Sequence, residues 1–137
     1  MKEAGLDDMA PKGYHFGSAP SESLLDKGWL IGHFFKDEAD VRSTRDVEVK
    51  WSNHAEGEQR DQWTAGETRT TLSLLITGQF EIALSTGVFI LKNPGDYLLW
   101  DRGIEHSWRA IRDSTILTVR WPSVPGQRRS SAIKSVR

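Results

Sequence analysis

Short extended segments, separated by tight-turn residues at nearly regular intervals, constrain the fold of this chain more than any other feature. The connections between the extended segments are short and contain Gly, Pro, Asn or Asp, as tight turns require. No stretch shows a sustained period of 3.6 residues, apart from one helical turn expected within residues 21–28. The predicted strands, rich in β-branched and aromatic residues, are 28–35, 47–51, 70–76, 79–84, 88–92, 96–100, 106–111 and 114–121.

This pattern predicts an all-β protein. We expect an antiparallel β-barrel or jelly roll, in which closure of the sheet removes exposed strand edges. A length of 137 residues suits one domain. Residues 28–122 form the predicted barrel, residues 1–27 a flexible N-terminal arm that is partly disordered or packs on the barrel, and residues 123–137 a polar, basic C-terminal tail.

Charge and composition exclude several classes of protein. The chain has 18 Lys and Arg against 19 Asp and Glu, a formal net charge of −1, which gives no electrostatic basis for binding nucleic acid or an anionic membrane. It has no cysteine, so disulfides and thiolate metal sites are excluded. Neither a signal peptide nor an apolar run of membrane-spanning length is visible, and we expect a cytoplasmic protein.

The glycines and the histidine between residues 78 and 106 follow a recognisable spacing. Gly95 is followed by five residues, then Asp101, one residue, Gly103, two residues and His106, and Gly78 ends the preceding extended segment. Over about residues 45–121 the chain resembles the cupin family, whose second motif has this spacing with Pro at the place of Asp101 and Asn at the place of Ala110. The resemblance implies a small antiparallel barrel and a homodimer. The outward apolar stripe Leu72, Leu74 and Ile76 would be covered by the arm or by a second subunit.

The resemblance also implies where a metal would be held. Metal-binding cupins carry Glu at the position of Thr71 and a His-x-His pair at Thr64 or Ala65 and at Gly66 or Glu67, so only His106 remains of the four usual ligands. Threonine is a poor ligand for Fe, Mn or Zn. We therefore expect no tightly bound metal. The alternative is a variant divalent-metal site made of His106, Glu67 and His54.

Strand parity suggests a second role for His106. The cupin resemblance places His106 and Thr71 inside the barrel. Because alternate residues of a strand share a face, Trp108 and Ala110 should point inward with His106, and Glu67, Arg69 and Ser73 with Thr71. Two interpretations stay open. Either Glu67 and Arg69 pair at the surface, or a polar ligand pocket exists. The predicted pocket consists of His106, Trp108, Glu67, Arg69, Thr71, Ser73 and Trp63.

Two functions remain open at this point. The first is a small-molecule-binding cupin without a metal, in a metabolite-binding or tailoring role. The second is a metal-dependent cupin enzyme, such as an oxygenase, isomerase or lyase, with a variant site around His106. A sugar-nucleotide epimerase is disfavoured because neither Tyr14 nor Tyr97 has a clear relation to His106. A transcription factor is disfavoured because no pair of DNA-binding helices is visible.

Overall fold

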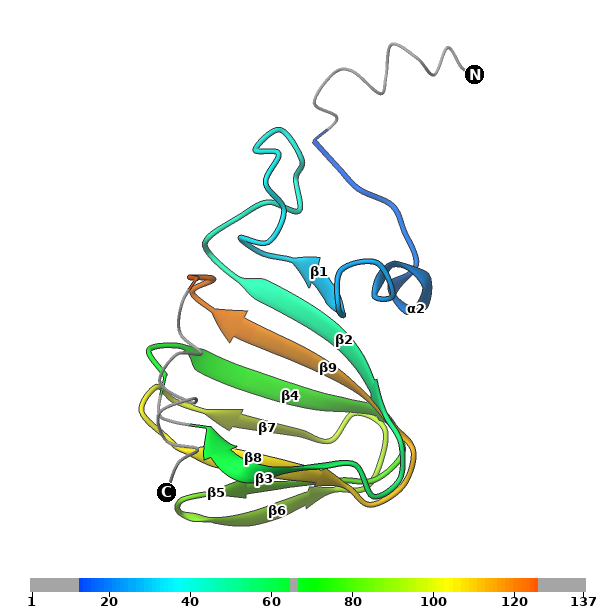
Figure 1. Cartoon of the computed structure of the whole chain (residues 1–137), viewed down its shortest axis with the longest axis vertical. Coiled ribbons are helices and arrows are strands. Elements are labelled where there is room, and N and C mark those ends of the chain that lie inside the picture. Colours follow the sequence, from blue (N-terminus) through cyan, green and yellow to red (C-terminus); the bar gives the residue numbers. More distant parts are fainter. Residues whose placement is uncertain (1–12, 65–66, 126–137) are drawn as a thin grey trace.

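Two antiparallel sheets face each other in the computed structural model, which describes residues 13–64 and 67–125 (Figure 1). The predicted arm and tail fall partly on residues 1–12 and 126–137, which lie outside the described residues. Within residues 13–64 and 67–125, no helix is long and apolar enough to cross a membrane. The elements are α2 (Ala19–Glu22), β1 (Trp29–Ile31), β2 (Glu48–His54), β3 (Gln59–Thr64), β4 (Thr70–Thr77), β5 (Phe80–Leu84), β6 (Gly87–Leu91), β7 (Tyr97–Trp100), β8 (His106–Ala110) and β9 (Ser114–Trp121).

The strand order confirms the all-β, antiparallel jelly-roll prediction and corrects the expected closure. One sheet has the order β1-β2-β9-β4-β7 and the other β3-β8-β5-β6. Among the described residues no ladder joins the two sheets, so β1, β7, β3 and β6 remain edge strands. Apolar packing between the facing sheets holds the structure together without a continuous barrel.

Most predicted strands are present, and two local expectations were wrong. The helical turn is α2, which begins at Ala19, before the predicted start of 21. The strand β3 was missed, because the first four residues of its sequence QRDQWT are all polar or charged and show no alternation with apolar residues. It pairs with β8 along an irregular register, in which Arg60 lies opposite Trp108 and Thr64 opposite His106.

The glycines of the spaced pattern lie at turns that need them. Gly78, between β4 and β5, has φ +104°, and a Cβ added there would collide with the Asp113 carbonyl and the Ser114 side chain. Gly95, before β7, has φ +96°. An L-residue with a side chain adopts such angles only with strain, so these positions favour glycine.

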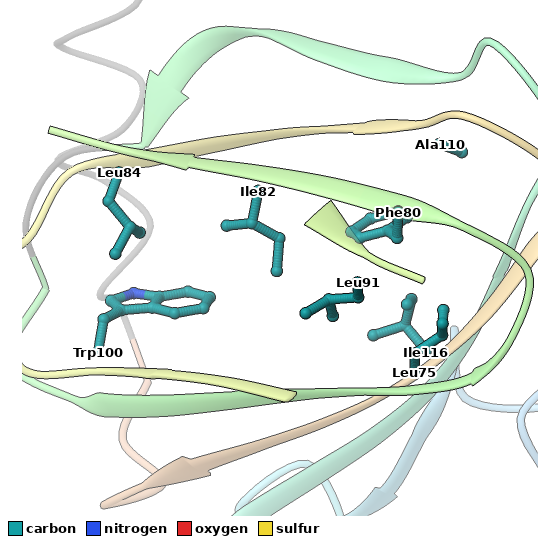
Figure 2. Close-up of a cluster of buried hydrophobic side chains, with 8 residues drawn as sticks. All are labelled: Leu75, Phe80, Ile82, Leu84, Leu91, Trp100, Ala110 and Ile116. Atoms are coloured by element: carbon teal, nitrogen blue, oxygen red, sulfur yellow. The ribbon is translucent and has the colours of Figure 1, made fainter. Parts of the chain in front are cut away.

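The hydrophobic core occupies one part of the space between the sheets. Figure 2 shows Leu84 and Ile82 projecting from the four-stranded sheet toward Trp100 of the other sheet. The buried core residues are Leu75, Phe80, Ile82, Leu84, Leu91, Trp100, Ala110 and Ile116.

Away from this core, the five-stranded sheet buries polar side chains and turns apolar ones outward. Along β2, Lys50 and Ser52 face the interior, whereas Val49 and Trp51 face away from it. The outward side chains form two rows across four strands. They are Leu99, Leu72, Val119 and Val49 in one row, and Tyr97, Leu74, Leu117 and Trp51 in the other. We call these eight residues the outer face.

A cluster of buried charges joins the five-stranded sheet to the segments beyond it. The Glu48 side chain is fully buried and accepts hydrogen bonds from Arg69 Nη1 at 2.7 Å and Ser123 Oγ at 2.9 Å. Arg120 Nη2 lies 2.7 Å from the same carboxylate, and Arg69 Nη2 lies 3.0 Å from Glu67 Oε1. We call these five residues the Glu48 cluster. Two carboxylates balance two guanidinium groups, so their burial leaves no net charge.

We predict that Glu48→Gln strongly destabilises the protein. The substitution leaves Arg69 and Arg120 with one carboxylate between them, and breaking a buried ion pair in this way costs about 3–5 kcal/mol of unfolding free energy. Urea unfolding followed by tryptophan fluorescence measures this loss.

The matched control is Glu81→Gln. It removes the carboxylate of a partly exposed pair, in which Arg109 Nη2 lies 3.0 Å from Glu81 Oε1, and should cost no more than about 1 kcal/mol. Equal losses for the two variants would contradict a special role for the Glu48 cluster.

Candidate functional site

A cavity of about 150 Å³ lies between the two sheets, next to the hydrophobic core. Seven strands contribute to its wall, so its shape depends on how the two sheets face each other. The lining residues are Lys50, Ser52 and His54 from β2; Arg60 from β3; Thr71 and Ser73 from β4; Phe80 and Ile82 from β5; Trp100 from β7; His106 and Trp108 from β8; and Ile116, Thr118 and Arg120 from β9.

Hydroxyl groups form the middle of the wall on the five-stranded sheet. The register places Ser73 of β4 directly opposite Thr118 of β9, and Ser52 of β2 opposite Ile116 of β9. Thr71 and Ser73 are both buried. Burying hydroxyls is costly unless they form hydrogen bonds, so this wall suits a polar occupant or ordered water.

Aromatic rings from both sheets also line the cavity: Phe80, His106 and Trp108 from the four-stranded sheet, and His54 and Trp100 from the ends of the five-stranded sheet's wall. The Trp108 ring stacks on Phe80 with the centroids 5.4 Å apart, and the His54 ring lies 4.5 Å from Trp108. On the other side, the Trp100 and His106 rings have centroids 4.9 Å apart. These rings present flat, polarisable surfaces against which a ligand can pack.

Burial favours the neutral form of the two histidines of the cavity. Burial lowers the pKa of His106, although the nearby Glu67 carboxylate partly opposes this effect. Burial likewise lowers the pKa of His54, against the opposing effect of Glu58. His54 Nε2 lies 3.0 Å from Ser52 Oγ, and among the described residues His106 Nδ1 has no hydrogen-bond partner.

The structure brings together four of the seven residues predicted for the pocket. Thr71, Ser73, His106 and Trp108 line the one cavity, although they come from both sheets. Their inward parity is therefore as expected, and a role in binding stays a prediction.

Glu67 and Arg69 pair with each other, with Arg69 Nη2 3.0 Å from Glu67 Oε1, but in the interior rather than at the surface or in the cavity wall. Each is buried, with exposed fractions of 8% and 4%, so they do not form a surface pair. Neither is among the cavity-lining residues, because their charged groups belong to the Glu48 cluster. Trp63 is also displaced from the predicted pocket. It borders a separate surface hollow beside Leu84 and Glu105.

Several lining residues were not predicted. For β2 a signal was present, because Lys50, Ser52 and His54 alternate with Val49 and Trp51 and so share one face. Thr118 and Arg120 alternate in the same way along β9. Arg60 had no such signal, because its strand was not recognised.

The cavity does not fit a mononuclear metal centre. In the described part of the chain, no group of three or more His, Cys, Asp or Glu side chains could hold a metal ion. His106 and His54 both line the cavity, but the third expected ligand, Glu67, lies 3.0 Å from Arg69 Nη2. Of the other positions compared with metal ligands, Thr71 and Thr64 are buried threonines, and Ala65 and Gly66 lie outside the described residues.

Comparison with known proteins identifies the fold. The structure resembles KdgF from a Halomonas species, with a TM-score of 0.54 and 21% identity over 59% of this chain and 74% of the other. The cupin domain of Cnp3 from Schizosaccharomyces pombe gives a TM-score of 0.53 and 14% identity over 65% of this chain and 61% of the other. This chain has the cupin fold. A conserved Klebsiella pneumoniae protein with a double-stranded β-helix domain is similar too, with a TM-score of 0.53 and 20% identity over 61% and 69% of the two chains.

The cupin resemblance read from the sequence is thus supported by the three-dimensional structure. Comparisons with protein-family models and with curated protein sequences give no match. Identities of 21% or less to the three cupin-like structures concern the fold alone. The function must therefore be argued from the cavity itself.

Proposed function

We propose that this cupin-fold protein binds a small molecule in the cavity between its sheets, without a resident metal ion. The observation that carries the proposal is the reversed polarity of the five-stranded sheet where it borders the cavity, away from the core residues Leu75, Trp100 and Ile116. Its interior positions include Lys50, Ser52, Ser73 and Thr118, whereas its outer face is apolar. A sheet that served only to enclose a core would bury the opposite set of side chains.

The energetic cost of this arrangement supports a binding role. A buried polar group without a partner costs about 1–3 kcal/mol. Within the described structure, His106 Nδ1 is a buried atom without a hydrogen-bond partner, and His54 Nδ1 has only Glu58 Oε1 at 3.5 Å. Functional sites commonly retain such costs, because the residues are selected for the ligand rather than for stability.

The absence of a resident metal is the second part of the proposal. The charged groups on the cavity wall are the cations Lys50, Arg60 and Arg120, and cations repel a divalent metal ion. The pair His54 and His106 supplies two of the three or four donors that a mononuclear site needs. A role in metabolite binding or tailoring follows more directly than metal-dependent chemistry.

We predict that Ser73→Val stabilises the protein and abolishes small-molecule binding. Valine replaces a buried hydroxyl at the cavity wall with methyl groups that fill part of the space, which should raise the unfolding free energy by about 1 kcal/mol. Binding is measured by NMR from the indole N–H signals of Trp100 and Trp108, with small polyols, sugars and organic acids as probes.

Ser107→Val is the matched control. Ser107 precedes Trp108 on β8 and pairs with Ala83 on the side of the sheet away from the cavity, so this variant should bind as the unmodified protein does. If no probe moves the two indole signals of the unmodified protein, the binding proposal is wrong.

We predict less than stoichiometric metal in the protein. Purification without chelators or metal-affinity resin, followed by elemental analysis, should give well below one equivalent of Fe, Mn, Zn or Ni per chain. Near one equivalent that is lost in His106→Ala would overturn the metal-free proposal and favour the metal-dependent enzyme.

The outer face leads to a proposal about assembly, in which two copies of the chain associate as a homodimer. Its two rows contain no charged residue, and Tyr97 and Leu99 are 60% and 51% exposed. Tyr14 and Phe16 of the arm are 67% and 93% exposed. A second copy packed on this surface would cover these exposed aromatic and aliphatic side chains.

We predict a dimer in light scattering coupled to size exclusion, and a folded monomer for Leu74→Lys. Leu74 lies between Tyr97 and Leu117 in the outer face, so a lysine there places a charge inside the interface. Val88→Lys, at an exposed position of β6 in the other sheet, should remain dimeric. A monomeric unmodified protein would refute the dimer.

A further inference from the structure

We infer that the ligand of the cavity is a compact organic acid whose carboxylate is bound beside Arg60. The inference rests on the proposed small-molecule site and adds the chemical class of the ligand. Three features of the cavity support it: the charged side chains on its wall, the aromatic rings on its wall, and its volume.

The charged side chains on the cavity wall all have the same sign. Lys50, Arg60 and Arg120 come from three different strands, two in one sheet and one in the other. The carboxylates of Glu48 and Glu67 belong to the Glu48 cluster, and neither residue is among the described lining residues. The described wall therefore offers positive groups and hydroxyls, which is a donor set for an anion.

Arg60 differs from the other two cations. Arg120 already has the Glu48 carboxylate at 2.7 Å, and the Lys50 ammonium lies 5.3 Å from the centre of the Trp29 ring. Arg60 forms no ion pair with the side chains that the structure describes, and it is exposed at the rim of the cavity. A guanidinium in this position can bind a carboxylate through two parallel N–H···O bonds.

His106 lines the cavity together with Arg60 and Arg120. Burial, together with the smaller effect of these two charges, lowers the pKa of His106. Its Nδ1 is a buried atom without a hydrogen-bond partner in the described structure. An acid that enters past Arg60 therefore lies close to the His106 imidazole, which lines the same cavity.

The size and the rings of the cavity limit the rest of the ligand. A volume of about 150 Å³ matches that of an engineered protein cavity that accepts benzene, so the ligand has about six to ten non-hydrogen atoms. The adjoining wall is the stacked pair Trp108 and Phe80. A carboxylate attached to a small ring or a short branched chain matches both the rim and the wall.

Isothermal titration calorimetry with matched probes tests this class. The probes are benzoate and cyclohexanecarboxylate, the neutral analogue benzamide, and inorganic phosphate. We expect both acids to bind at least roughly tenfold more tightly than benzamide, the difference expected for a charge-assisted hydrogen bond. The affinity of the acids should fall as salt is raised, because Arg60 is exposed to solvent, whereas that of benzamide should not.

Variants at two arginines test whether Arg60, at the rim of the cavity, causes the preference for acids over benzamide. Arg60→Gln should lose the preference for acids over benzamide, and Arg60→Lys should retain part of it. Arg109→Gln is the control, because Arg109 is next to Trp108 on β8 but pairs with Glu81 outside the cavity. Its acid affinity should stay within about twofold of the unmodified protein, as expected for an exposed charge.

The outcomes separate the ligand class from the binding site. If benzamide or neutral sugars shift the Trp108 signal and acids bind no better, the site stands and the acid class is wrong. If phosphate binds more tightly than both carboxylates, the ligand is an anion of another class and the inference is again wrong. If no probe binds, both the acid class and the proposed function fail.

Discussion

The buried carboxylate of Glu48 is the interaction on which the arrangement of the site depends. It holds Arg120 at the edge of the cavity and Arg69 behind it, and it accepts a hydrogen bond from Ser123 after the last strand. The residues that it joins are separated by 21 to 75 positions in the sequence. The His33 backbone N–H also donates to Ser123 Oγ at 2.9 Å, so the segment after β1 is tied to the same group.

This cluster explains why the interior of the five-stranded sheet can be polar. Arg69 and Arg120 neutralise Glu48 and Glu67 close by, so four charges are buried in a balanced set, two on strands of the sheet and two in the segment before β4. The hydrophobic core is then confined to the region around Leu75, Ile82 and Trp100. The space between this core and the charged cluster is the cavity.

The sequence predicted the local features of this structure better than its long-range pairings. Gly78 and Gly95 could be interpreted because backbone angles at a turn depend on neighbouring residues. The inward direction of Thr71 and His106 was implied by the cupin resemblance, and strand parity extended it to Ser73 and Trp108. The roles of Glu67 and Arg69 could not be predicted in the same way, because their position is decided by Glu48 and Arg120 on other strands. Arg60 was missed because β3 is held by its pairing with β8 rather than by its own sequence preference.

The reversed polarity of the sheet has a consequence for strand alignment. In most half-buried sheets a slip of one residue exposes the hydrophobic side chains, and this penalty keeps the strands in register. Here a slip of β2 against β9 would turn Val49 and Trp51 inward, which hydrophobicity alone would favour. What opposes the slip is electrostatic, because it would separate Glu48 from Arg120, directly opposite it in the native pairing. In this protein, ion pairing rather than hydrophobic patterning distinguishes the correct alignment of these strands from a misaligned one.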